Sequence, residues 1–489
     1  MGIEFGIIKL LAAFIGVSVG IVFGALPGMT ATMAIAVFLP LTYAYDLNTS
    51  LYLLLGLYVG GISGGLIPAI LINIPGTPSS ITTGFDGHPM AQRGEGEKAL
   101  KIGITVSFIG GIFSLIALFL FTPPLARLAI KFSAVEKFLI ILFAMTVIAA
   151  LSKGNMIKGI FAGFLGTLIS LVGQFPDNNV LRMVPQAFRV ELRAGFQLLP
   201  VLIGLFALSQ IFQEAESGMK ENPISTDMSD SKSTFSFSFL KGQVTNLIRS
   251  SVIGTFLGIL PGVGGSAASI LSYSQAKNFA KHPEEFGNGA EEGLVASETA
   301  NNALTGGALI PLLSLGIPGD STTAVLVGAF LLQGIQVGPL FISRNPGTWY
   351  TILFALLLCN ILMFVIMFYP IKFVAKIIQF PKNRIYPVII LMCVVGAYAV
   401  RNGNMFDVWT LLIFGLVGYI FSKIGIPSAP FLIGFILGRD LEKYFVDSIK
   451  GSGGSLMCFF ERPLGWGIWG LIFLSIAYAV YDNKKSKKA

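Results

Sequence analysis

The sequence predicts an all-α polytopic membrane protein with about ten to twelve transmembrane segments, and two observations lead to this prediction. The first is composition: 54% of the 489 residues are hydrophobic, only 12% are charged, and the mean hydropathy is +0.77. A soluble domain usually carries about twice that share of charge. The second is a series of charge-free runs, such as Lys9 to Asp46 and Arg344 to Lys372, that are long enough for membrane-spanning helices.

The same composition excludes several classes of function. A chain with so little charge cannot cover a soluble surface, which argues against a soluble enzyme and a disordered protein. The net charge of +8 is not a nucleic-acid footprint, because excess Lys and Arg in a membrane protein gather in cytoplasmic loops. We therefore expect no nucleic-acid partner, a lipid bilayer around the chain, and a cytoplasmic location for the basic tail that follows Asp482.

Three motifs recur in the same order and indicate a duplicated unit. The G-x3-G-x-L-P-G pattern at 20–28 returns at 254–262, 234 residues later. The L-I-P and I-P-G motifs at 66–76 return at 309–319, 243 residues later, and Gly154-Asn155-Met156 returns as Gly403-Asn404-Met405 after 249 residues. We predict two pseudo-symmetric repeats, residues 1–212 and 248–489, joined by a polar linker at 213–247. Inverted repeats are common in secondary transporters, so an inverted arrangement is favoured.

Four Pro-Gly pairs interrupt the apolar segments: Pro27-Gly28, Pro75-Gly76, Pro261-Gly262 and Pro318-Gly319. Proline lacks an N–H group and clashes with the preceding helical turn, so we expect broken helices or re-entrant hairpins. Ser and Thr residues follow each pair and are suited to cap a new helix. A helix N-terminus favours an anion, and the carbonyls released before the break can coordinate a cation. Ordinary kinks, with Ser and Thr bonded back to the helix, are the alternative.

These breaks and the polar residues beside them define the candidate site. We expect the substrate anion to contact residues at or after the breaks, together with one asparagine from the second half: Thr30, Asn73, Gly76, Thr77, Ser79, Ser80, Ser266, Asn301, Gly319, Ser321 and Thr322. We expect a coupling cation, Na⁺ or H⁺, near carboxylate, amide and carbonyl oxygens: Pro75, Glu298, Asn302, Pro318 and Asp320. For Glu298 the alternative is the end of a polar loop, and for Asn73 it is an interhelical hydrogen bond.

Enzyme motifs receive little support. Gly61-x-Ser63-x-Gly65 matches a hydrolase nucleophile motif, but no strand-turn-helix surrounds it, and His88 and His282 lie in polar loops. The sequence contains neither a phosphate-binding loop nor a zinc motif. We expect no catalytic residues, no cofactor and no metal beyond a transported Na⁺; a membrane Ser hydrolase and a passive pore are the alternatives of other classes.

Long motifs resemble the signature of one transporter family. Asn73-Ile74-Pro75-Gly76-Thr77-Pro78 and Asp86-Gly87-His88-Pro89-Met90-Ala91 resemble the large membrane subunit of tripartite tricarboxylate transporters. So do Ser297-Glu298-Thr299-Ala300-Asn301-Asn302-Ala303, the Gly316-Ile317-Pro318-Gly319 segment, and Phe459-Phe460-Glu461-Arg462-Pro463 near the C-terminus. The resemblance covers essentially the whole chain.

The resemblance implies a secondary transporter subunit in the cytoplasmic membrane of a bacterium or archaeon. It implies import of a di- or tricarboxylate, driven by a sodium or proton gradient. It also implies a small membrane subunit and an extracytoplasmic solute-binding protein as partners. The alternative within the same fold is a stand-alone carboxylate carrier without partner subunits.

Overall fold

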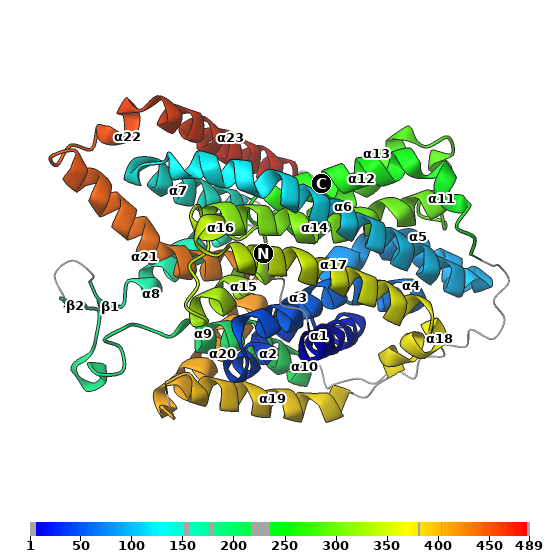
Figure 1. Ribbon diagram of the computed structural model, residues 1–489, viewed down its shortest axis with the longest axis horizontal. Helices are drawn as coiled ribbons and strands as arrows, with labels where there is room; N and C mark the ends of the chain where they lie inside the picture. The colour runs from blue at the N-terminus through cyan, green and yellow to red at the C-terminus, as the bar shows by residue number, and fades with distance from the viewer. Residues whose placement is uncertain are drawn as a thin grey trace.

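The protein is a bundle of helices in which long and broken elements alternate (Figure 1). The computed structural model describes residues 6–150, 156–175, 180–216, 235–379, 382–401 and 403–486. Within these ranges the only strands are β1 (Gly173–Gln174) and β2 (Leu181–Arg182), which pair antiparallel at the left edge of the view. The predicted all-α class is therefore confirmed.

The first half contains helices on both sides of two breaks. Its elements are α1 (Ile7–Ala25), α2 (Ala31–Phe38), η1 (Leu39–Ala44), α3 (Leu47–Gly64), α4 (Leu66–Ile72), η2 (Pro78–Ser80), α5 (Ile81–Met90), η3 (Ala91–Glu95), α6 (Gly96–Ile130), α7 (Ala134–Ala150), α8 (Met156–Ser170), η4 (Gln186–Phe188), α9 (Leu198–Ile203), η5 (Gly204–Leu208) and α10 (Ser209–Glu216).

The second half follows a similar sequence of long and short helices. Its elements are α11 (Phe239–Gly242), α12 (Val244–Ile259), α13 (Gly264–Phe279), η6 (Pro283–Glu285), α14 (Glu291–Leu315), α15 (Ser321–Leu332), α16 (Phe341–Arg344), α17 (Pro346–Phe368), α18 (Ile371–Val374), η7 (Ala375–Gln379), α19 (Lys382–Ala399), α20 (Met405–Ile424), α21 (Ser428–Gly451), α22 (Cys458–Glu461) and α23 (Pro463–Ser486).

Breaks limit the number of full-length spans. Among the described residues, six helices are long and apolar enough to cross a bilayer, and a bent pair at 371–399 makes a seventh candidate. Five more apolar helices, including α12 and α15, are shorter. A helix needs about 20 residues to cross the hydrocarbon, and the Pro-Gly breaks divide several apolar segments below that length. The expected ten to twelve segments stay a prediction.

Close contacts at glycine residues pack α1 against α3 and α12 against α14. A methyl group built on Gly24 of α1 would collide with the backbone of Gly61 in α3. One built on Gly258 of α12 would lie 2.8 Å from the carbonyl oxygen of Leu304 in α14. Leu304 follows Gly61 by 243 residues, the same offset as the I-P-G motifs. The duplication itself stays a prediction, and Gly154 and Asn155 of its third motif lie outside the described residues.

Helices α10 and α12 extend into the two ends of the polar linker predicted at 213–247. Helix α10 continues to Glu216, and α12 begins at Val244, where apolar residues resume. Residues 217–234 of this linker lie outside the described residues, as do 487–489 of the basic tail. The three cysteines, Cys359, Cys393 and Cys458, are buried and free.

Helix α14 occupies the centre of the bundle (Figure 1). It packs against α6, α12 and α13, and it also contacts α3 and α5 of the first half. Nearly all of its residues from Gly293 to Ser314 are buried, including Glu298, Asn301 and Asn302. A buried helix with polar side chains in the middle of a membrane protein is where a functional site is expected.

The close backbone approach at the second break can be tested with Gly319→Ala. A Cβ at this position would lie 2.5 Å from the Gly258 carbonyl oxygen and 2.6 Å from the Cα of Ala308. Because backbone atoms cannot give way easily, we expect a loss of about 1–3 kcal/mol or more in unfolding free energy, measured as a lower melting temperature in detergent. Gly470→Ala in α23, where nothing lies within 4 Å, is the matched control and should leave the melting temperature unchanged or raise it.

Candidate functional site

The first break separates α4 from α5. Asn73 caps the end of α4, and its φ of 54° is left-handed, a conformation that asparagine tolerates at helix ends. The chain then runs through Pro75 to Thr77, which forms a capping box with Ser80. Gly76 packs against the carbonyl oxygen of Gly24 at the end of α1. The break is thus held by its own cap and by the backbone of α1.

The second break separates α14 from α15 in the same manner. Helix α14 ends at Gly316, again left-handed with a φ of 78°. Asp320 caps α15: its Oδ1 accepts a hydrogen bond from the backbone N–H of Thr323 at 2.7 Å, and the Thr323 hydroxyl accepts from Asp320 N at 2.9 Å. Gly262 N–H donates to the Gly319 carbonyl at 2.7 Å. A carboxylate at a helix N-terminus is also favoured by the helix dipole.

The remaining two breaks end α1 and α12 and start a new helix soon afterwards. Thr30 caps α2 by accepting a hydrogen bond from Met33 N–H at 3.1 Å. Val263 precedes α13 and offers no side-chain cap. The first N–H groups of α13 therefore lack the side-chain acceptor that α2 has.

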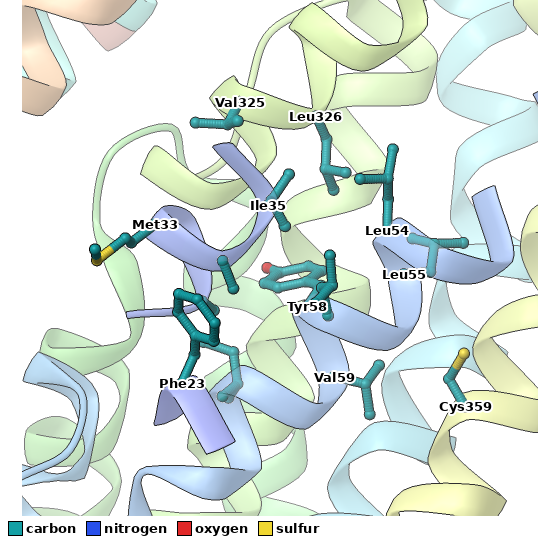
Figure 2. Close-up of a cluster of buried hydrophobic side chains, with 14 of the residues drawn as sticks. Phe23, Met33, Ile35, Leu54, Leu55, Tyr58, Val59, Val325, Leu326 and Cys359 are labelled. Atoms are coloured by element: carbon teal, nitrogen blue, oxygen red, sulfur yellow. The ribbon is translucent and has the colours of Figure 1, made fainter. Parts of the chain in front are cut away.

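Helix α3 and the start of α2 contact the tip of the second break. The Tyr58 hydroxyl donates to Asp320 Oδ2 at 3.1 Å, and the hydroxyls of Thr32 and Thr322 lie 2.8 Å apart. Figure 2 shows the Tyr58 ring among apolar side chains of α1, α2, α3 and α15, including Ile35. These side chains are buried, so the hydrogen bonds of Asp320 lie in an apolar environment.

Glu298 forms a second buried polar cluster. It is 0% exposed, and its carboxylate accepts hydrogen bonds from Thr83 of α5 and from Ser107 of α6, the latter at 3.1 Å. Asn302 donates to Ser107 at 2.8 Å and accepts from the Ser63 hydroxyl at 2.7 Å. The cluster joins α14 to three helices of the first half. Its partners are hydroxyl and amide groups, which suit a proton or a hard cation such as Na⁺.

Asn301 lies beside this cluster and is unlike the other buried amides. Its side chain is 0% exposed, and neither its Nδ2 nor its Oδ1 has a hydrogen-bond partner. The Glu298 carboxylate lies near it, one helical turn earlier, without a hydrogen bond of normal geometry. A Cβ built on Gly265 would lie 3.0 Å from Asn301 Oδ1 and 2.6 Å from the Cβ of Ser79. Asn301 therefore meets the tip of the first break and the start of α13.

The structure places the residues predicted from sequence as follows. Eleven are buried, namely Gly76, Thr77, Ser79, Ser80, Glu298, Asn301, Asn302, Pro318, Gly319, Asp320 and Thr322, whereas Thr30, Pro75, Ser266 and Ser321 are half-buried and Asn73 is exposed. Six of the buried residues lie in three groups: Asn301 with Ser79, Glu298 with Asn302, and Asp320 with Thr322. In the described part of the chain, no group of three or more His, Cys, Asp or Glu side chains could hold a metal ion.

Sequence reasoning missed several members of these groups. Tyr58 and Ser107 lie in helices whose apolar pattern gives no sign of a polar site, Ser63 stood out only as part of a hydrolase motif, and Thr83 is one of several polar residues in α5. Tyr58 could have been found from the repeat, because Asn301 follows it by 243 residues. Gly265 likewise follows Ala31, just after the first break, by 234 residues.

Comparison with known proteins identifies the family. A model described as the tripartite tricarboxylate transporter TctA family matches residues 10–433. The chain belongs to this family. An uncharacterized 52.8 kDa protein in the TAR-I ttuC' 3' region of Agrobacterium vitis is 34% identical over 482 residues, 98% of this chain and 95% of that protein. An uncharacterized protein in the TAR-II ttuC' 3' region is 37% identical over 235 residues, 48% of this chain and 97% of the relative. No solved structure matches the chain.

Membership in the TctA family makes the chain the membrane subunit of a transporter rather than an enzyme. A tripartite transporter works with partner subunits and a binding protein in a lipid bilayer. The structure explains why the hydrolase motif is unrelated to catalysis. Ser63 lies within helix α3 and donates to Asn302. The prediction that His88 lies in a loop is wrong, because His88 is part of helix α5, and its ring nitrogen contacts the carbonyl oxygen of Ile70 at 3.1 Å.

The hydrogen bond between Tyr58 and Asp320 should stabilise this TctA-family protein. We expect Tyr58→Phe to lower the unfolding free energy by about 1–3 kcal/mol, because a buried carboxylate loses one donor. Tyr52→Phe is the matched control, since Tyr52 is buried in the same helix and its hydroxyl has no hydrogen-bond partner. Thermal unfolding in detergent compares the two variants. Equal melting temperatures for both would show that the hydrogen bond contributes nothing.

Proposed function

We propose that this subunit imports a small di- or tricarboxylate across the cytoplasmic membrane of a bacterium or archaeon, driven by a gradient of Na⁺ or H⁺. The observation that carries the proposal is the pair of buried carboxylates, Glu298 and Asp320, each packed beside a helix break of a TctA-family chain. Ionisable groups inside a membrane protein are costly, so they are typical of ion and substrate pathways. Broken helices supply N-terminal ends for the anion and carbonyls for the cation.

Glu298 is the better candidate for the coupling site. Asp320 already caps α15 and accepts a hydrogen bond from the Tyr58 hydroxyl. Glu298 instead gathers its partners from α5, α6 and α14, so loading or unloading a cation there would act on the packing of several helices at once. Asn302 completes the cluster: its Nδ2 donates to Glu298 Oε2 at 3.3 Å, and its Oδ1 accepts from the Ser63 hydroxyl. We propose that a proton or Na⁺ enters this cluster with the substrate.

Alternating access would follow from a relative movement of the two predicted halves. An extracytoplasmic solute-binding protein would deliver the carboxylate, and a small membrane subunit would complete the assembly. A stand-alone carrier is the second candidate; it would take up substrate without either partner. The family name favours the assembly with partners.

Uptake measurements test the coupling role. Membrane vesicles that contain the full assembly would be given labelled citrate or succinate under an imposed Na⁺ or H⁺ gradient. We expect Glu298→Gln to reduce gradient-driven accumulation by about tenfold or more, as loss of one charged-group interaction predicts. Accumulation by the variant at the wild-type rate, with the same ion dependence, would contradict the proposal.

The matched control for that experiment is Glu216→Gln. Glu216 is a surface carboxylate at the end of α10 that pairs with Lys423, and its side chain is 47% exposed. Exposed ion pairs contribute little to stability, so the variant should transport normally. A comparable loss in both variants would indicate a general folding defect rather than a coupling role for Glu298.

A further inference from the structure

Two crossings of helix breaks occupy corresponding places in the predicted repeats. In the second crossing, the tip at 319–322 meets the end of α12, the start of α2 and Tyr58 of α3. In the first crossing, the tip at 76–79 meets the end of α1, the start of α13 and Asn301 of α14. The residues correspond by the offsets of the sequence motifs: Asn301 follows Tyr58 by 243 residues, and Thr322 follows Ser79 by 243 residues.

The second crossing is closed by its own side chains. Tyr58 fills the space between the helices with a ring that is 0% exposed and donates its hydroxyl to Asp320. The hydroxyl of Thr32 joins that of Thr322 at 2.8 Å, and Thr30 caps α2. Every polar group named here has a partner inside the protein. These side chains therefore satisfy one another and join α2 and α3 to the tip before α15; we call this crossing the latch.

The first crossing differs at the position of Tyr58 and at the cap of the helix after the break, whereas Ser266 and Ser79 take the places of Thr32 and Thr322. Asn301 stands in place of Tyr58, and both polar atoms of its buried side chain lack a hydrogen-bond partner. Gly265 stands in place of Ala31, and Ser79 and Asn301 approach it closely: a Cβ there would lie 2.6 Å from the Cβ of Ser79 and 3.0 Å from Asn301 Oδ1. Val263 provides no cap for α13. The buried hydroxyl of Ser269, further along α13, also lacks a partner.

We infer that the two crossings have different roles, and that the first crossing alone binds a carboxylate group of the transported anion. The inference rests on the proposed function and assigns its substrate to one place. The N–H groups at the start of α13 and the amide N–H of Asn301 would donate to the carboxylate, with the Ser79 hydroxyl as a third donor. The adjacent Glu298 would repel this anion unless a cation or proton neutralised it, which would couple the two binding events.

The test is carboxylate binding by the purified full-length chain, measured as a shift of the melting temperature with citrate or succinate in the presence of sodium. Binding to the native state raises the melting temperature by mass action. We expect Asn301→Ala and Ser79→Ala to weaken binding by about tenfold or more. Tyr58→Phe, the control in the second crossing, should lower the melting temperature without ligand and keep the wild-type affinity.

Ser79→Ala keeps the test decisive if Asn301→Ala does not fold, because it removes only a hydroxyl. Gly265→Ala adds a methyl that would lie 2.6 Å from the Cβ of Ser79 and 3.0 Å from Asn301 Oδ1, so these groups must shift, and we expect weaker binding together with a lower melting temperature without ligand. Wild-type affinity in the Asn301, Ser79 and Gly265 variants would overturn the assignment to the first crossing alone. Loss of binding in Tyr58→Phe would overturn the separation of roles. A wild-type chain that shows neither a carboxylate-dependent shift nor uptake would overturn the proposed function as well.

Discussion

Backbone groups released at a helix break must be satisfied within the protein, because hydrocarbon offers no hydrogen bonds. Two of the four Pro-Gly breaks are joined directly, because Gly262 N–H donates to the Gly319 carbonyl at 2.7 Å. Gly76 N–H instead donates to the carbonyl of Gly65, between α3 and α4, at 3.4 Å. Such approaches require glycine, since a side chain would strike the facing backbone. The close backbone approaches at Gly76 and Gly319 thus help to fix which helices cross and place polar groups of α14 beside the tips.

Electrostatic repulsion couples anion binding to cation binding at the proposed site. Side chains three residues apart on a helix lie about 5–6 Å apart, which describes Glu298 and Asn301. Two negative charges at that distance repel by about 3 kcal/mol at an effective dielectric constant of 20. A carboxylate bound at Asn301 and a charged Glu298 therefore disfavour each other by about a hundredfold. A cation or proton at Glu298 removes this penalty. The substrate and the cation therefore each bind more tightly when the other is bound.

The sequence predicted the broken helices well because Pro-Gly pairs and caps are local signals. Asp320 and Thr77 follow their breaks directly, and both form the capping boxes that Ser, Thr and Asp favour. The contacts of Tyr58, Thr83 and Ser107 could not be predicted, because they depend on how helices far apart in the chain pack together. The number of spans was also hard to predict, since a broken apolar segment divides into pieces shorter than a bilayer.

The central claim is that a carboxylate binds at the first crossing while the second remains latched. The most direct measurement is an experimental structure of the chain determined with citrate and sodium. The account predicts ligand density against Asn301, Ser79 and the start of α13, with Tyr58 still bonded to Asp320. Density between Tyr58 and Asp320, with Asn301 uncontacted, would contradict it.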